Sequence, residues 1–303
     1  MSIVQKQNLP SQIEMLAAQR NLYSTAKRII GLQMILSGPI AVCATLLGIA
    51  DPNLKNYVTL WGLIVLIFDL TIFYPWQKKL RENGAKVQEL FDCSVLSLSW
   101  NEIKAGKKPD PELVHEQATK FGLDENDLAG LKDWYPVNVQ TVPVQWGSII
   151  CQRSNVWWDS KLRRRYATTV FSALVVITLA LLGYGVYMHK EMLEFIAYIA
   201  APMASAYVVG YRQITEHRDA ADRLDKLKDH AEKLWTEAIS GATVGSLQVK
   251  ARHLQDEIFD GRKRNPPIFD FIFKWFRTEH EVQMNKGAKV LLEEAVKFNK
   301  SGL

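Results

Sequence analysis

The feature that most constrains this chain is a run of 22 residues, Ala167 to Met188, without a charged side chain. A helix needs about 20 apolar residues to cross a bilayer, so this run is long enough. Two tryptophans and four basic residues precede it: Trp157, Trp158, Lys161, Arg163, Arg164 and Arg165. Aromatic side chains gather at the membrane interface, and basic ones favour the cytoplasmic side. The order predicts a helix that enters the membrane from the cytoplasm. A buried helix of a soluble protein fits less well, because such helices are usually shorter.

Three further apolar runs are candidate spans. Ile29 to Ala50 also has 22 residues without a charge, and Tyr57 to Trp76 has a single acidic residue. The fourth run, Met192 to Tyr211, is the weakest because Glu194 interrupts it. Six residues separate the first two runs and three separate the last two. Such short connections join antiparallel helices, so we predict two helical hairpins with four spans.

Lysine and arginine are distributed unevenly around these spans. The residues before the first span include four basic side chains and one acid, and each short hairpin connection holds one lysine. The remaining 31 of the 37 basic residues follow the second or the fourth span. By the positive-inside rule both termini and the central segment are cytoplasmic. We therefore predict an all-α multi-pass membrane protein, with two transmembrane hairpins and a mostly helical cytosolic region.

The predicted division has five parts: a cytosolic amphipathic N-terminal helix (1–28), a first transmembrane hairpin (29–76), a cytosolic central region (77–166), a second transmembrane hairpin (167–211) and a cytosolic helical C-terminal region (212–303). Ile13, Leu16 and Leu22 give the N-terminal helix an apolar face, which suits a helical period. That face fits either the membrane surface or packing against the cytosolic region.

The segment after the fourth span predicts a charged helix over residues 212–239. Ala220, Leu227 and Leu234 recur every seven residues, and so do Leu224, Ala231 and Ala238. Three repeats are marginal for a coiled coil, so we expect this stripe to pack against the charged helix predicted over residues 77–99. Residues 133–136 and 142–144 predict extended segments that lead to the helix beginning at Cys151.

The sequence offers little for catalysis. It has no nucleophile elbow, phosphate-binding glycine loop, His-Glu-x-x-His helix or Cys-x-x-Cys pair, which are the common signatures of catalytic sites. The three cysteines have no paired spacing, as a disulfide framework or zinc site would require. We expect no enzyme activity, no metal and no cofactor.

Several polar residues fall inside the predicted spans: Asp69, Thr71, Thr178 and Ser205. An ionisable group in the membrane is costly and is by default a functional candidate. Asp69 is therefore a candidate pore or intramembrane polar site, although it could instead be hydrated near the cytoplasmic end or pair with Lys78 or Lys79. The threonines and the serine are weaker candidates, because such residues often serve only as helix contacts. Four spans cannot enclose a wide aqueous path, so a pore would need an oligomer.

Two groups of arginines with aromatic residues have the composition of a site for a phosphate-bearing ligand. The first comprises Arg153, Trp157, Trp158, Arg163, Arg164 and Arg165, and the second comprises Arg262, Arg264 and Trp275. Guanidinium groups bind phosphate in a bidentate manner and stack on rings. For the first group an interfacial anchor of the neighbouring span is the favoured alternative.

Short stretches along most of the chain also match a known pattern. They are Gln7-Asn8, Leu16-Ala-Ala-Gln-Arg-Asn-Leu-Tyr23 with Ala26-Lys27, Phe91-Asp-Cys-Ser-Val-Leu96 with Trp100-Asn101, Trp134-Tyr-Pro136, and Cys151-Gln-Arg-Ser-Asn155 with Trp158-Asp159. With the two apolar hairpins, they resemble the SMODS-associating four-transmembrane effector family (S-4TM).

The resemblance implies a pore-forming effector of a bacterial, CBASS-like antiphage system, located in the inner membrane. It also implies a functional link to a nucleotidyltransferase that produces a cyclic oligonucleotide, with this nucleotide as a possible ligand on the cytosolic side. The expected partners are the lipid bilayer and further copies of the chain, and no nucleic acid polymer. Two other readings stay open: a membrane scaffold that docks soluble partners on the heptad stripe, and a membrane enzyme with an unrecognised cytosolic fold.

Overall fold

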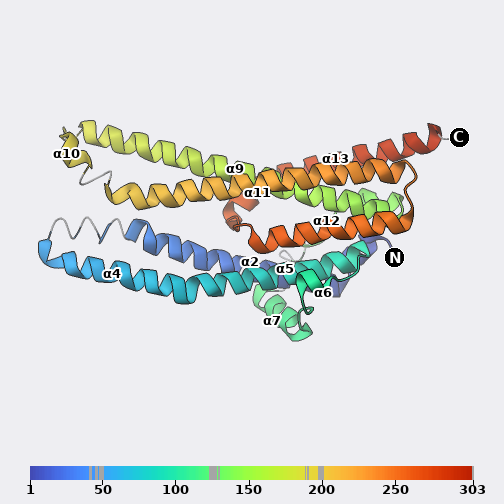
Figure 1. Cartoon of the computed structure of the whole chain (residues 1–303), viewed down its shortest axis with the longest axis horizontal. Helices are drawn as coiled ribbons and strands as arrows, with labels where there is room; N and C mark the ends of the chain where they lie inside the picture. The colour runs from blue at the N-terminus through green and yellow to red at the C-terminus, as the bar shows by residue number, and fades with distance from the viewer. Residues whose placement is uncertain are drawn as a thin grey trace. The chain divides into compact units, whose positions relative to one another are not determined.

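Every regular element of the chain is helical among the residues that the computed structural model describes, which are 1–40, 43–44, 47, 51–122, 128, 130–187, 189, 191–196 and 201–301 (Figure 1). The α-helices are α1 (Ile3–Gln7), α2 (Pro10–Ser37), α4 (Lys55–Phe68), α5 (Tyr74–Leu96), α6 (Glu102–Ala105), α7 (Pro111–Phe121), α9 (Val144–Tyr187), α10 (Met192–Phe195), α11 (Ala201–Ile239), α12 (Val244–Arg264) and α13 (Asp270–Ser301). Two 3-10 helices, η1 (Pro52–Leu54) and η3 (Val137–Thr141), and a π-helical turn, η2 (Asp69–Phe73), complete the set. The predicted all-α class is confirmed.

The chain divides into two compact units. The core unit comprises Met1–Ser24, Leu80–Arg163 and Ala220–Leu303, and the hairpin unit comprises Thr25–Lys79 and Arg164–Asp219. Each of the four long helices α2, α5, α9 and α11 has residues in both units. The assignment of these parts to membrane and cytosol is not given by the helices themselves and stays a prediction.

The hairpin unit turns its apolar side chains outward. Leu63, Leu70, Val176 and Leu179 are all more than half exposed, whereas water-soluble chains rarely expose contiguous apolar patches of this kind. Two helical stretches, Leu60–Leu96 and Val144–Tyr187, are long and apolar enough to cross a membrane. They contain residues 60–76 of the predicted second span and residues 167–187 of the predicted third span.

The other two predicted spans are described only in part. Helix α2 continues the first span as far as Ser37, and residues 41, 42, 45, 46 and 48–50 of that span lie outside the described residues. In the fourth span, α10 and α11 flank residues 197–200, which also lie outside them.

The N-terminal helix packs inside the core unit. The side chains of Leu16 and Leu22 are almost fully buried, in one cluster with Val87 and Phe91 of α5. The spacing of its apolar residues puts them on one face of a helix, and that face is covered by protein. Of the two alternatives left open by the sequence, packing against other helices of the chain is therefore the one observed.

The heptad stripe of α11 is mostly buried. Leu234 and Ala238 lie in one cluster with Val87 of the 77–99 helix, but the earlier part of the stripe has other partners than we predicted. Leu224 and Ala231 form a cluster with Val156 of α9 and with Leu254 and Ile258 of α12. The expected packing against the 77–99 helix is wrong for this part of the stripe. Sequence spacing fixes which face of a helix is apolar, but not which of several apolar faces will cover it.

Helix α9 begins earlier than predicted. It starts at Val144, not Cys151, so Val144, which we predicted to be extended, and residues 145–150 are helical. Pro143 precedes the first turn, and its carbonyl accepts a hydrogen bond of 2.9 Å from the Gly147 amide. Proline is tolerated at a helix start because the first amide groups have no partner there. Gly147 also lets α9 approach α1 closely, since a Cβ at this position would lie 2.9 Å from Ile3 Cδ1.

Phe91 provides a test of the core unit. Its ring is fully buried and lies 6.1 Å from the ring of Tyr135 and 6.4 Å from that of Trp134. Replacement of a buried phenylalanine by alanine removes apolar contacts and leaves a cavity, so Phe91→Ala should lower the free energy of unfolding by about 3–5 kcal/mol. Denaturant unfolding in detergent micelles measures this. Ile103→Ala is the control, because Ile103 is 97% exposed, and it should leave stability unchanged.

Candidate functional site

The first two residues of the quoted pattern hold the segment before η3. The Tyr135 amide donates to Gln7 Oε1 (2.7 Å), and Gln7 Nε2 donates to the Tyr135 carbonyl (3.3 Å). Asn8 and Asp133 make a similar exchange: Asn8 Nδ2 donates to Asp133 Oδ1 (2.8 Å) and the Asp133 amide donates to Asn8 Oδ1 (3.0 Å). This double clamp fixes the backbone from which the Tyr135 ring enters the core.

The hydroxyl of Tyr135 joins a set of buried polar side chains, which we call the buried polar cluster. Its members are Glu89 and Asp92 of α5, Tyr135, Gln152 of α9, and Arg252, Gln255 and Arg262 of α12. Asp92 is at its centre and is completely buried. Its Oδ1 accepts from Tyr135 Oη (2.7 Å), and its Oδ2 accepts from Gln255 Nε2 (2.8 Å) and Arg262 Nη1 (2.5 Å).

Gln255 connects Asp92 with the rest of the cluster. Its amide nitrogen also donates to Glu89 Oε2 (2.9 Å), and its Oε1 accepts from Gln152 Nε2 (3.0 Å). Glu89 Oε1 in turn accepts from Arg252 Nη2 (2.5 Å). The cluster thus ties α5, α12 and the Tyr135 segment together through charge-assisted hydrogen bonds, which are about twice as strong as neutral ones. Helix α9 joins through the neutral Gln152–Gln255 bond.

A second contact set extends from Arg252. Its Nη1 donates to the Ser99 carbonyl (2.7 Å), and its Nη2 lies 3.1 Å from Asp256 Oδ1. Asp256 Oδ2 accepts from Asn101 Nδ2 (2.9 Å). Asn101 belongs to the same quoted pattern as Gln7, Asp92, Tyr135 and Gln152. The stretches that carry the resemblance therefore meet at one buried place.

Burial decides the protonation chemistry of the cluster. It raises the pKa of Glu89, and the charge of Asp92 raises it further while Arg252 lowers it. Burial also raises the pKa of the Cys93 thiol to about 12 and holds the pKa of Tyr135 well above its ordinary value. For Arg262 burial lowers the pKa, but the charges of Asp92, Tyr135, Tyr23 and Glu89 together raise it above its ordinary value, so the guanidinium stays charged. A neutral thiol and phenol are poor nucleophiles, so this arrangement fastens helices together.

The structure gives different surroundings to the members of the second arginine group, which are Arg262, Arg264 and Trp275. Arg262 is buried against Asp92, whereas Arg264 Nη2 lies 3.3 Å from Asp260 and its side chain is 71% exposed. Trp275 is 73% exposed on α13. Arg262 therefore acts in the buried polar cluster in this structure.

The first group is also divided. Arg153 donates from Nε and Nη2 to Glu232 Oε1 (3.1 and 2.7 Å), and Arg163 donates from Nη1 to the Pro266 carbonyl (2.8 Å). The rings of Trp157 and Trp158 lie 6.1 and 5.4 Å from that of His280. Arg164 and Arg165 belong to the hairpin unit, where their carbonyls accept from Thr168 and Thr169. A role of these six residues in ligand binding stays a prediction.

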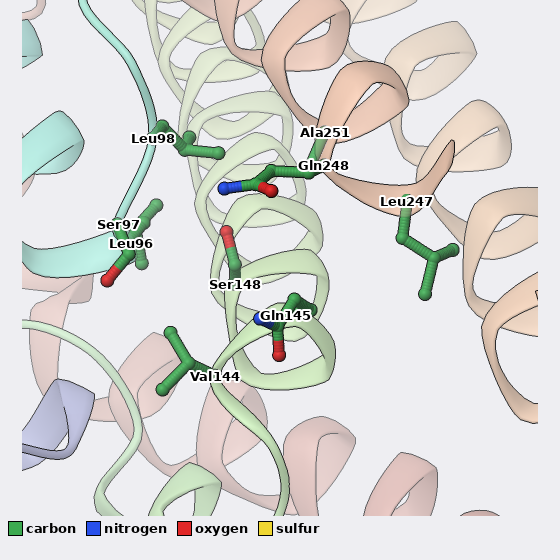
Figure 2. A pocket seen from close by; sticks show the side chains of 9 residues that line it. All are labelled: Leu96, Ser97, Leu98, Val144, Gln145, Ser148, Leu247, Gln248 and Ala251. Carbon is green, nitrogen blue, oxygen red and sulfur yellow. The ribbon is translucent and has the colours of Figure 1, made fainter. Parts of the chain in front are cut away.

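Figure 2 shows a small cavity of the core unit, where the end of α5, the start of α9 and the start of α12 meet. Its polar lining includes Ser97, Gln145, Ser148 and Gln248, and its volume is about 30 Å³. The Ser148 hydroxyl is buried and has no hydrogen-bond partner among the described residues. The cavity suits a single water molecule, whereas drug-sized ligands occupy pockets of roughly 300–1,000 Å³.

The polar residues of the hairpin unit make local contacts. Gln33 Nε2 of α2 donates to Asp69 Oδ1, at the first residue of the π-helical turn η2. Thr178 Oγ1 of α9 is 2.7 Å from the hydroxyl of Tyr207 on α11 and also donates to its own helix at Leu174. One side-chain hydrogen bond thus joins α2 to η2, and another joins α9 to α11.

The other two polar candidates of the predicted spans are Thr71 and Ser205. Thr71 Oγ1 donates to the Ile67 carbonyl of its own helix (2.6 Å), as threonines in helices commonly do. The side chain of Ser205 lies outside the described residues. Asp69 remains a candidate for the intramembrane polar site, because it begins a π-helical turn and such turns are frequent at functional sites.

Comparison with known proteins decides the family. The family model described as "SMODS-associating 4TM effector domain" matches residues 1–291. The chain belongs to this family. It is thus a membrane protein of the SMODS-associating 4TM effector family, as its motifs indicated. The chain is also 27% identical, over 290 residues, to a protein from Bacillus cereus (strain VD146) named "Probable CBASS effector molecule". That match covers 92% of this chain and 94% of the relative. No solved structure matches the chain.

Sequence reasoning missed most of the buried polar cluster. Glu89 and Asp92 are three residues apart, among the buried residues Val87, Phe91 and Val95. A signal was present, because acids at apolar positions of an amphipathic helix must find buried partners. Arg252 and Gln255 repeat this spacing on α12, but nothing in the sequence shows that these two helices meet.

The Asp92–Arg262 pair gives the sharpest test of the cluster. Asp92→Asn leaves the buried guanidinium without its counter-charge, and should therefore cost about 3–5 kcal/mol of unfolding free energy. The double variant Asp92→Asn with Arg262→Met removes both charges and should recover part of that loss. Asp110→Asn, in the exposed pair Lys107–Asp110, is the matched control and should not change stability. Equal stability of Asp92→Asn and the wild type would contradict a structural role for the pair.

Proposed function

We propose that this protein is a pore-forming effector of a nucleotide-signalled antiphage (CBASS) system, which damages the bacterial inner membrane when a cyclic oligonucleotide is sensed in the cytosol. One structural observation carries the proposal: a hairpin unit with outward-facing apolar side chains shares four long helices with a charged core unit. Family membership and the CBASS name of the Bacillus cereus relative support it.

In the proposed topology the chain crosses the membrane four times, at residues 29–50, 57–76, 167–188 and 192–211. The N-terminal helix, the central region and the C-terminal region are cytoplasmic. This placement follows the positive-inside rule, and it puts the buried polar cluster in the cytosol. In this proposal the effector performs no chemical step.

The pore requires several copies of the chain. A four-helix set has no room for a wide aqueous path, whereas a ring of hairpins could place Asp69, Thr71, Thr178 and Ser205 around a shared path. The interhelical hydrogen bonds Gln33–Asp69 and Thr178–Tyr207 satisfy polar groups within one chain. Opening would exchange these partners for water, which is favourable only if ligand binding supplies the difference.

The signal would come from a functionally linked nucleotidyltransferase, which supplies the cyclic oligonucleotide. A ligand shifts a conformational equilibrium only by binding one state better than the other. The cavity of Figure 2 is too small for a dinucleotide, so the ligand would bind a rearranged core unit or its surface. Arg153, Trp157, Trp158 and Arg163–Arg165 stay the candidate contacts, with Arg153 leaving Glu232 to reach phosphate.

The scaffold alternative is less well supported, because the structure covers its proposed docking face. It required Leu224, Leu227 and Leu234 to receive a partner, but Leu224 and Leu234 are almost fully buried and Leu227 is partly buried against α9 and α12. A partner would have to unpack the core unit to reach them. Pore formation is therefore the better supported function.

Leakage from liposomes tests the proposal. Purified protein is inserted into dye-loaded vesicles, and cyclic di- and trinucleotides are added one at a time. We expect leakage with one nucleotide and none without it, because the apolar hairpins should open only when the core unit binds its ligand. Vesicles without protein and a linear dinucleotide are the controls. Inserted, folded protein that leaks with none of the nucleotides would contradict the proposal.

Continuous helices should carry the signal between the two units. Two glycines inserted after Trp76 in α5, or after Tyr211 in α11, each cost about 1 kcal/mol of helix stability relative to alanine. Such an insertion should reduce ligand-triggered leakage by at least about tenfold, since 1.4 kcal/mol is a factor of ten. The same insertion after Lys108, in the exposed connection between α6 and α7, is the control. A full response in the α5 and α11 variants would show that coupling follows another route.

A further inference from the structure

The first residue of α13 and the segment before the helix are bonded to two helices just before their predicted spans begin. Arg163 of α9 donates to the Pro266 carbonyl (2.8 Å), and Ser24 of α2 donates to Asp270 Oδ2 (2.9 Å). Arg163 precedes the charge-free run at Ala167 by four residues, and Ser24 precedes the run at Ile29 by five. At 1.5 Å per residue these distances along the helices are about 6–8 Å.

The inward side of the same turns is well packed. Ile272 is almost fully buried, and the ring of Phe273 lies 6.3 Å from that of Trp158. The guanidinium of Arg20 lies over the Phe273 ring, 5.3 Å from its centre. These contacts fix which side of α13 faces away from the core unit.

The outward side exposes two large aromatic rings. Phe271 is 66% exposed and Trp275 is 73% exposed. They are four residues apart and so lie on one face of the helix, with the exposed Lys274 between them. Arg264, before the helix, has a side chain that is 71% exposed. Core packing does not explain why apolar rings of this size are presented beside basic groups.

We propose that the outward face of residues 264–275 is an interfacial anchor that inserts into the headgroup layer of the cytoplasmic leaflet and prefers anionic phospholipid. We call Arg264, Phe271, Lys274 and Trp275 the anchor residues. Tryptophan and phenylalanine next to basic side chains are the composition of interfacial helices, and each basic group near an anionic surface adds attraction. The proposal rests on the proposed topology, because that topology puts the starts of the first and third spans at the same leaflet.

The anchor would give the core unit a fixed reference at the membrane. The Pro266 and Asp270 contacts connect it with α9 and α2, and Arg262, four residues before Pro266, belongs to the buried polar cluster. A rearrangement of α12 would therefore act on the anchor residues through these contacts. No other element is needed to connect the cluster with the lipid surface.

A control position is available on the same helix. Val296 of α13 is 54% exposed and follows Trp275 by 21 residues, about 32 Å along the helix. Within the core unit α13 follows α9 toward the start of α9, because the segment before α13 bonds to Arg163 and Gly287 lies against Arg153, ten residues earlier. Val176, in the predicted third span, is 64% exposed and serves as the lipid reference.

Site-directed spin labelling of the full chain tests the anchor. Nitroxides are placed at Trp275→Cys, Val296→Cys or Val176→Cys in a Cys43→Ala background, since the native thiols Cys93 and Cys151 are buried. A label at Phe271→Cys repeats the test with Trp275 intact. Collision with oxygen, which enters lipid, and with a water-soluble nickel chelate is measured in nanodiscs of phosphatidylcholine, with or without phosphatidylglycerol.

We expect the oxygen-to-nickel accessibility ratio at 275 and 271 to be severalfold higher than at 296 and closer to that at 176. Charge reversal by Lys274→Glu with Arg264→Glu should reduce the ratio at 271 in discs with phosphatidylglycerol. A water-like ratio at 275 and 271, with a lipid-like ratio at 176, would overturn the anchor and leave the proposed function standing. Water-like ratios at all positions would overturn both. Dipolar broadening at 275 from a neighbouring copy would overturn the anchor in favour of a contact between protomers.

Discussion

The structure depends on one buried ion pair, Asp92 with Arg262, and on the hydrogen bonds that complete it. Placing a carboxylate and a guanidinium in the interior is costly unless each group is paired, and Asp92 meets this condition with three donors from two different segments. A shift of α12 against α5 would break these bonds together. The buried polar cluster therefore favours a single register of the core helices, and it gives a ligand a defined arrangement to disrupt.

The hairpin unit follows the opposite rule, as expected for a part of the chain that we propose to lie in hydrocarbon. Its apolar side chains face outward, and its few polar ones bond within the chain, as Gln33 does with Asp69 and Thr178 with Tyr207. Polar groups in lipid need internal partners. Helices α2, α5, α9 and α11 belong to both units, so in the proposed topology a change in core packing can act on the spans without an intervening flexible connection. The interfacial anchor would add a second point of attachment, at the leaflet surface.

The cavity beside Ser148 holds about one water, so it is not a preformed site for a ligand of nucleotide size. The arginines that are candidates for binding phosphate form ion pairs within the protein: Arg153 pairs with Glu232, and Arg262 pairs with Asp92. Binding would have to compete with these ion pairs, and the cost of breaking them would set the threshold for activation. Such a threshold suits an effector that must stay closed until its signal appears.

The sequence by itself determined the helical class, the apolar runs and the family, because charge-free length and local motifs are properties of neighbouring residues. It also determined which faces of the N-terminal helix and of α11 are apolar. Only the tertiary structure decided what covers them: α5 for Leu16 and Leu22, and α9 with α12 for Leu224 and Ala231. The same holds for Asp92, Tyr135, Gln255 and Arg262, which are up to 170 residues apart and whose pairing depends on how helices meet. Local pattern fixes an element and its faces, whereas contacts between distant elements are chosen by the packing of the whole unit.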